Sequence, residues 1–268
     1  MKHSTMVTPG ERVRLSEIDP DFHEDLRKKD RIVRERTDVA RDEMRLLQER
    51  LYAEGEQSLL IVLQALDAGG KDGTIKHVMR GLNPAGVSVS GFKRPTPEEL
   101  AHDFLWRIHP HVPARGQVAV FNRSHYEDVL IVRVHGLVSE SVWERRYNQI
   151  NEFEELLAET GTRILKLFLY ISKDEQKERL QKRLDDPAKH WKFAPGDLKE
   201  RRLWDDYIEA FEVALTRCST EVAPWHIIPA NRKWYRNMIV AELVAATLRD
   251  MDPQFPAVDF DPASIVIE

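Results

Sequence analysis

The segment Ser58–Thr74 constrains the fold of this chain more than any other stretch. It begins with the run Leu59–Leu66, which is too apolar for a strand with one face in water and predicts a central strand of a parallel sheet. Three glycines and a lysine follow: Gly69, Gly70, Lys71 and Gly73. Glycines let backbone amides turn towards an anion, and a following helix adds the positive end of its dipole. The segment therefore predicts a strand, a phosphate-binding loop and a helix.

The predicted loop departs from the standard phosphate-loop pattern G-x-x-x-x-G-K-[ST] at two positions. Ala65 stands where the first glycine would be, and Asp72 stands where Ser or Thr would be. A glycine-rich turn with an incidental lysine is therefore an alternative interpretation. Asp67 favours the phosphate site, because it lies at the C-terminal end of the strand, where doubly wound α/β sheets bind ligands. A carboxylate beside a phosphate in turn requires Mg²⁺.

Composition bounds the class of protein. The 268 residues suffice for one large core, and 45 acidic against 40 basic residues give a net charge of −5, which argues against a nucleic-acid-binding protein. The single cysteine, Cys218, excludes an internal disulfide framework and a cysteine zinc site. No apolar run is long enough to span a bilayer, and the N-terminus is polar. We therefore expect a soluble cytoplasmic protein that binds neither nucleic acid nor membrane.

Helical and strand patterns alternate along the chain without repeats or linkers, which predicts a three-layer α/β/α domain with a five-stranded parallel sheet. Residues 1–20 have few apolar anchors, and we expect an arm that lies on the surface or on a partner subunit. Residues 21–268 form the single domain, which opens with a long amphipathic helix from Asp21 to about Glu54. The other expected strands are 87–92, 117–121, 163–171 and 225–228, and the later helices are one from about 98, then 139–159, 200–217 and 234–250.

Polar segments follow two of these strands. Lys93 and Arg94 come after the second strand, at the same sheet edge as Lys71, and form either a second phosphate contact or only a basic turn. The third strand runs into the segment Asn122–Asp128. An arginine beside two carboxylates in this segment, Arg123 with Glu127 and Asp128, indicates a phosphate-and-metal site. The alternative is a helix start capped by Ser124 in a capping box with Glu127, and both can hold together.

The segment of residues 173–197 is a predicted lid. From Lys177 to Lys192 it holds six Lys and Arg residues against three acidic residues, and Arg179 and Arg183 share one helix face. Such a segment can close over phosphates. The alternative is a charged helix that is only solvated.

Three motifs together resemble the family-2 polyphosphate kinases: residues 67–73, 122–128 and 173–192, with the run Ala223–Asn231 in support. The resemblance covers nearly the whole chain after residue 20. It implies a P-loop-kinase-like fold, dependence on Mg²⁺ with Mn²⁺ as a possible substitute, and phosphoryl transfer between inorganic polyphosphate and AMP, ADP or ATP. It also implies a homo-oligomer, either a dimer or a tetramer.

The resemblance also implies roles for individual residues. Asp67 would bind Mg²⁺, Lys71 the phosphates and Arg123 the transferring phosphoryl group. Many members have Asp where this chain has Asn122, and Trp-Tyr-Asn where it has His125–Glu127. In these departures the chain is similar to the subgroup that phosphorylates both AMP and ADP. The expected catalytic residues are Asp67, Lys71, Arg123, Glu127, Asp128 and Arg183, and the expected metal ligands are Asp67, Glu127 and Asp128. The expected phosphate-binding residues are Gly69, Gly70, Lys71, Asp72, Gly73, Lys93, Arg94, Arg179 and Lys189.

Two competing functions have distinct sequence signatures. An ATP-dependent nucleoside monophosphate kinase has the same fold and a similar lid but needs Ser or Thr after the loop lysine, where this chain has Asp72. A non-catalytic polyanion-binding module has no need of carboxylates near Lys71. This chain offers four: Asp67, Asp72, Glu127 and Asp128.

Overall fold

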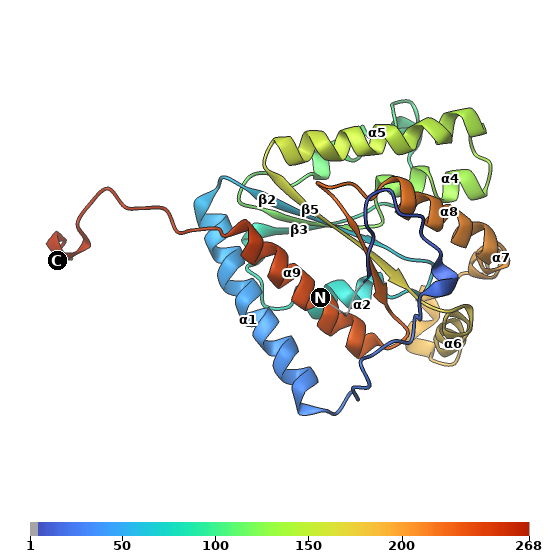
Figure 1. The fold of residues 1–268 in the computed structure, drawn as a ribbon, viewed down its shortest axis with the longest axis horizontal. Coiled ribbons are helices and arrows are strands. Elements are labelled where there is room, and N and C mark those ends of the chain that lie inside the picture. Colours follow the sequence, from blue (N-terminus) through green and yellow to red (C-terminus); the bar gives the residue numbers. More distant parts are fainter. Residues whose placement is uncertain (1–4, 268) are drawn as a thin grey trace.

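The centre of the fold is a twisted sheet, described in a computed structural model that covers residues 5–267 (Figure 1). Within these residues the sheet has six strands in the order β1-β6-β5-β2-β4-β3. Their bounds are β1 Thr5–Met6, β2 Ser58–Gln64, β3 Val87–Gly91, β4 Val118–Asn122, β5 Thr162–Tyr170 and β6 Trp225–Pro229. Strands β2 to β6 are parallel, as the sequence predicted, and β1 is an additional antiparallel strand at the edge.

Strand β2 lies inside the sheet, and each of its residues is buried. Leu59 pairs with Val118 of β4 on one side and with Arg163 of β5 on the other. The chain leaves β2 towards β3 and β4 but leaves β5 towards β6, so the connections diverge between β2 and β5. Such a divergence opens a crevice at the carboxyl ends of parallel strands, which is where open α/β sheets bind ligands.

Helices cover both faces of the sheet, as a three-layer fold requires (Figure 1). Helices α1, α2 and α9 pack against one another on one face, and α5 and α8 cover the other. The helix bounds are α1 Arg31–Glu54, α2 Lys71–Val78, α3 Pro97–Leu100, α4 Ile131–Val134, α5 Glu140–Glu159, α6 Lys173–Leu184, α7 Gly196–Arg202, α8 Trp204–Arg217 and α9 Lys233–Met251. No helix within residues 5–267 combines the length and the apolar character needed to cross a membrane.

Three helix boundaries differ from the sequence expectations. The first long helix begins at Arg31 instead of Asp21, because Glu24 and Asp25 take left-handed φ angles of 54° and 57° that no α-helix accommodates. The helix expected from about residue 98 is the single turn α3. The helix expected over 200–217 is interrupted at Leu203 and forms α7 and α8. Tertiary contacts accompany the first of these differences, since Glu24 accepts hydrogen bonds from Arg36 and Tyr235.

The N-terminal segment lies along the domain of its own chain. Met6 of β1 pairs with His226 of β6, and the side chains of Val7, Val13 and Leu15 are buried. The arm expected over residues 1–20 thus has apolar contacts from residue 7 onwards, while residues 1–4 lie outside the described part of the chain.

A buried ion pair lies beneath the sheet, next to the turn that follows β4. Lys166 of β5 and Glu154 of α5 are both fully buried, and the Lys166 Nζ lies 2.5 Å from a Glu154 oxygen. The same ammonium donates to the Tyr126 hydroxyl at 2.8 Å and to the Cys218 carbonyl. Tyr126 belongs to η4, the short turn His125–Asp128. The pair therefore anchors the segment that carries Glu127 to both β5 and α5.

We expect the substitution Lys166→Met to lower the free energy of unfolding by about 3–5 kcal/mol, because Glu154 would stay buried without a cation. The double variant Lys166→Met/Glu154→Leu removes both charges and should recover most of this loss. Chemical denaturation of the two variants checks the expectation. A single variant within 1 kcal/mol of the wild type, or a double variant no more stable than the single one, would contradict it.

Candidate active site

The loop between β2 and α2 forms one end of the crevice. Gly70 precedes the first residue of α2 with φ +103°, and a Cβ at this position would lie 2.0 Å from the Arg236 Nη1. Only glycine meets both conditions. Ala68, in the same loop, has a left-handed φ of 60°, which costs a non-glycine residue about 1–2 kcal/mol. The surrounding structure must therefore hold this loop in place.

Lys71, at the start of α2, is a buried cation. Its Nζ donates to the Ala65 carbonyl at 2.8 Å. Burial lowers the pKa of Lys71 from 10.5 to about 8, with a further decrease from Arg123 that Asp67 and other carboxylates oppose. A charge held in a poorly solvated position interacts strongly with an anion that reaches it.

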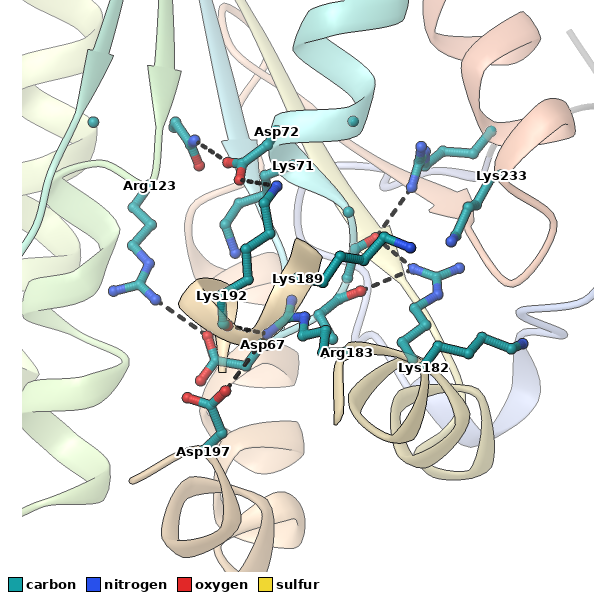
Figure 2. A pocket seen from close by; sticks show the side chains of 18 of the residues that line it. Asp67, Lys71, Asp72, Arg123, Lys182, Arg183, Lys189, Lys192, Asp197 and Lys233 are labelled. Atoms are coloured by element: carbon teal, nitrogen blue, oxygen red, sulfur yellow. Dashed lines mark hydrogen bonds and ion pairs between the residues drawn. The ribbon is translucent and has the colours of Figure 1, made fainter. Parts of the chain in front are cut away.

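Lys71 lines a cavity of about 840 Å³ that opens at the carboxyl ends of the strands (Figure 2). Among the described residues, its walls carry ten lysine and arginine side chains against five aspartates. The cations are Lys71, Lys93, Arg123, Arg179, Lys182, Arg183, Lys189, Lys192, Lys233 and Arg236, and the aspartates are Asp67, Asp72, Asp185, Asp186 and Asp197. A cleft lined mainly by cations concentrates an anionic ligand.

Most residues predicted for the site line this cavity. They are Asp67, Gly69, Gly70, Lys71, Asp72, Gly73, Lys93, Arg123, Arg179, Arg183 and Lys189. Three predicted residues do not: Arg94, Glu127 and Asp128. Arg94 is exposed to solvent, and Asp128 pairs with Arg146 of α5 at 2.8 Å instead of pointing into the cavity. The sequence placed Asp128 with the metal ligands because it is next to Glu127, but adjacent residues of a turn point in different directions.

Glu127 lines a second, smaller cavity of about 170 Å³. Burial raises the pKa of Glu127, and Arg123 and Lys71 oppose the increase. Ser124 caps the short turn η4 by accepting a hydrogen bond from the Tyr126 amide, not from the Glu127 amide as a capping box requires. The turn that carries Glu127 is a 3₁₀ segment and not the start of a long helix.

Asp67 and Arg123 lie between the two cavities and line both. The Arg123 Nη2 donates to the Asp67 Oδ1 at 3.1 Å (Figure 2). Arg123 has a left-handed φ of 65°, and its amide donates to the Leu63 carbonyl of β2. A non-glycine residue held in this conformation is typical of functional sites. The arrangement places one carboxylate and one guanidinium at the boundary between the two cavities.

The predicted lid segment closes one side of the large cavity (Figure 2). Lys192 approaches Asp72 of α2 at 3.9 Å, and Asp72 also accepts a hydrogen bond from Asn122 at 2.8 Å. Arg183 donates to the Lys192 carbonyl at 3.0 Å and lies 3.5 Å from Asp197. Cations of the lid therefore lie over the phosphate loop.

Sequence reasoning missed several charged residues of the site, among them Asp197, Lys233 and Arg236. Lys233 and Arg236 lie in the first turn of α9, just after the carboxyl end of β6. The rule that placed Lys93 and Arg94 at the sheet edge would also have found them. Arg236 is 2% exposed, and burial together with the neighbouring Arg179 lowers its pKa.

A comparison with known protein families identifies the chain. The family model described as polyphosphate kinase 2 (PPK2) matches residues 27–256. The chain belongs to the polyphosphate kinase 2 family. The resemblance seen in the sequence is therefore confirmed.

Individual relatives of this polyphosphate kinase cover nearly its whole length. The AMP/ADP-polyphosphate phosphotransferase of Meiothermus ruber is 52% identical over 98% of this chain and 98% of that protein. The ADP-polyphosphate phosphotransferase of Rhodopseudomonas palustris is 43% identical over 93% of this chain and 90% of its own. The crystal structure of polyphosphate kinase 2 from Arthrobacter aurescens has a TM-score of 0.90 at 45% identity, covering 98% of this chain and 97% of that one.

For this polyphosphate kinase, we expect Lys71→Met to reduce turnover at least a hundredfold, because the substitution removes a preorganised cation from the phosphate site. The fold should remain as stable as the wild type or become more stable, since the charge is costly to bury. Steady-state kinetics and thermal unfolding measure the two effects. Near-normal turnover in the folded variant would remove Lys71 from the site.

The pH dependence of stability supplies a control for the same variant. The folded protein has a Lys71 pKa of about 8 and the unfolded chain one near 10.5, so the unfolded state binds more protons between these values. Lys71 therefore makes the wild type more stable as the pH rises from about 8 to 10.5. The Met variant should lack this contribution, so the wild type should gain stability relative to the variant over that pH window.

Proposed function

We propose that this protein transfers phosphoryl groups from inorganic polyphosphate to AMP and ADP, making ADP and ATP. One observation carries the proposal: a large cation-lined cavity meets a smaller aromatic cavity at Asp67 and Arg123. The names of the Meiothermus ruber and Rhodopseudomonas palustris relatives support these substrates.

The large cavity suits a polyphosphate donor better than a nucleotide. Its described walls are dominated by lysine, arginine and aspartate, and Phe92 and His77 are the aromatic rings among them. Phe92 is buried against Phe121, with ring centroids 4.9 Å apart, so its faces are occupied by the core. A polyanion needs neutralising charge along its length but no slot for a base. The lysine and arginine side chains of this cavity supply that charge.

The small cavity suits the nucleoside of the acceptor. Apolar and aromatic side chains form much of its wall: Leu130, Ile131, Trp204, Tyr207 and Phe211. Its charged groups are Arg123 and the three carboxylates Asp67, Glu127 and Glu200, which would repel a polyanion. Its volume of about 170 Å³ equals roughly six water molecules at about 30 Å³ each, which is room for one planar ring system. A nucleotide bound there would direct its phosphates towards Arg123.

The site fits a divalent cation, and we propose Mg²⁺, with Mn²⁺ as a possible substitute. No group of three or more His, Cys, Asp or Glu side chains arranged to hold a metal occurs within the described residues. Mg²⁺ does not need one, because it is usually bound by one or two carboxylates together with substrate phosphates and water. Asp67 is the central carboxylate. Asp197 lines the same cavity and is the second carboxylate, since the charge of Asp67 adds to burial in raising the Asp197 pKa.

The reaction requires charge placement rather than a protein nucleophile. A transferring phosphoryl group spreads negative charge over its oxygens, and the bound metal would neutralise part of this charge. Lys71 supplies fixed positive charge from the large cavity, and Arg123 supplies it from the boundary between the two cavities. Lid residues such as Arg183 and Lys192 cover the donor, which excludes water that would otherwise accept the phosphoryl group.

Asn122 and Glu127 support the acceptance of both AMP and ADP. Asn122 is neutral and donates to Asp72, so it places no carboxylate at the end of β4. Glu127 then supplies the carboxylate on the acceptor side, from a turn rather than from the strand end. We propose that this arrangement supports metal beside either an α- or a β-phosphate, and that both steps take place at one site.

Oligomerisation and cytoplasmic location stay predictions. The segment after α9 runs away from the domain (Figure 1), and it exposes Phe255, Val258 and Phe260. Exposed apolar side chains of this kind are common where proteins meet. They support the proposed dimer or tetramer.

The first test supplies purified protein with Mg²⁺, polyphosphate and AMP, and resolves the nucleotides by chromatography over time. We expect ADP to rise before ATP, because two phosphoryl transfers follow one another at the same site. A reaction without metal should show no turnover. If AMP is phosphorylated only after ATP is added, the protein is an ATP-dependent monophosphate kinase. Binding without any turnover would favour the polyanion-binding module.

The second test concerns the small cavity. Tyr207→Ala removes an aromatic wall and should raise the KM for AMP roughly tenfold, since stacking of a base on an aromatic ring contributes about 1–3 kcal/mol. The KM for polyphosphate should stay unchanged. Tyr207→Phe keeps the ring and serves as the matched control. Equal effects on both Michaelis constants, or a KM for AMP unaffected by Tyr207→Ala, would place the acceptor elsewhere.

A further inference from the structure

Arg179 of the lid helix α6 was expected to bind phosphate, but its guanidinium group is fully occupied within the protein. A guanidinium has five N–H donors. The Nε of Arg179 donates to Glu175 at 2.7 Å. The Nη1 donates to the carbonyls of Ala68 and Gly69, both at 3.0 Å, and the Nη2 donates to the carbonyls of Ala230 and Asn231 at 2.5 and 3.0 Å. The residue is 6% exposed, so no donor remains for a phosphate.

These bonds join three separate segments: α6, the phosphate loop and the turn between β6 and α9. The turn leads directly into Lys233 and Arg236, which line the large cavity. A second residue of α6 reinforces the connection, since the Gln176 amide donates to the Asp67 carbonyl at 2.9 Å. Helix α6 therefore binds the carbonyl groups of three successive loop residues, from 67 to 69.

Fixing these carbonyls fixes the loop amides as well. A peptide unit is planar, so the carbonyl of one residue sets the direction of the next residue's N–H. The Gly69 carbonyl held by Arg179 thus sets the direction of the Gly70 amide, which immediately precedes α2. The peptide groups on both sides of the Ala68 Cα are held by α6, since Gln176 binds the Asp67 carbonyl and Arg179 binds the Ala68 carbonyl. These two bonds hold Ala68 in its disfavoured left-handed conformation.

We propose that Arg179 is a positioning residue that holds the phosphate loop in its binding conformation and does not itself bind phosphate. Its contribution reaches the substrate through the loop backbone and Lys71. Arg183, one helical turn further along α6, is the contrasting residue. Both residues line the large cavity, but the Arg183 side chain is 23% exposed against 5% for Arg179, and Arg183 makes its hydrogen bonds through Nη1. The inference rests on the proposed role of the loop in phosphate binding.

The test compares Arg179→Lys with the matched variant Arg183→Lys. Lysine keeps the positive charge but cannot bridge the two pairs of carbonyls that the planar fork of Arg179 joins. We expect Arg179→Lys to lower kcat at least tenfold and to leave the KM for polyphosphate within about threefold of the wild-type value. Arg183→Lys is compared by loop exchange and not by turnover, because Arg183 itself lines the donor cavity. Hydrogen exchange of the loop amides 67–71 should speed up in Arg179→Lys alone.

A rescue experiment keeps the proposal testable if Arg179→Lys is poorly stable. Glycine adopts a left-handed φ without steric cost, so Ala68→Gly should restore several-fold of the lost kcat in the Arg179→Lys background and give no gain in the wild type. A phosphate ligand lost at position 179 would not be restored in this way.

Three results would overturn the proposal: near-normal kcat in Arg179→Lys, a raised KM for polyphosphate at unchanged kcat, or loop exchange equal to that of Arg183→Lys. The exchange comparison needs no turnover. If the wild-type protein transfers no phosphoryl group from polyphosphate, the proposed function fails, while the exchange data still decide the role of Arg179.

Discussion

The conformation of the phosphate loop is the constraint on which the site depends. Ala68 and Gly70 both take positive φ angles, and Gly70 lies against the Arg236 guanidinium. Such a loop does not hold its shape by local preference alone. The fork of Arg179 and the amide of Gln176 hold it from α6, which also carries Lys182 and Arg183 into the cavity. Loop and lid are therefore one connected unit.

The separation of charge between the two cavities suggests how the protein distinguishes donor from acceptor. The large cavity is lined mainly by cations, while the small one combines aromatic rings with carboxylates. The carboxylates of the small cavity would repel polyphosphate, and the large cavity has no open aromatic slot for a base. Asp67 and Arg123 join the two, so the transferring group would lie where the environments meet. The buried pair of Lys166 and Glu154 binds the hydroxyl of Tyr126, which precedes Glu127 in the turn after β4.

Much of the fold is predictable from local sequence patterns. The run Leu59–Leu66 is apolar on both faces, which only a central parallel strand can bury, and the polar segments after successive strands must meet at one edge of the sheet. The family likewise follows from three spaced motifs in one order. The predicted start of the first long helix was less accurate, because Glu24 takes a left-handed φ and bonds with Arg36 and Tyr235 in a stretch whose pattern looks helical.

By itself, the sequence determined the parallel sheet, the phosphate loop, the family and eleven of the residues that line the large cavity. Only the tertiary structure decided what each side chain faces. Arg179 and Arg183 share a helix face in the sequence and both line the cavity, yet Arg179 is bound by five internal acceptors while the Arg183 side chain is 23% exposed. Asp128 lies next to Glu127 but pairs with Arg146. Periodicity assigns a residue to a face, but the groups opposite that face come from distant segments that only folding brings together.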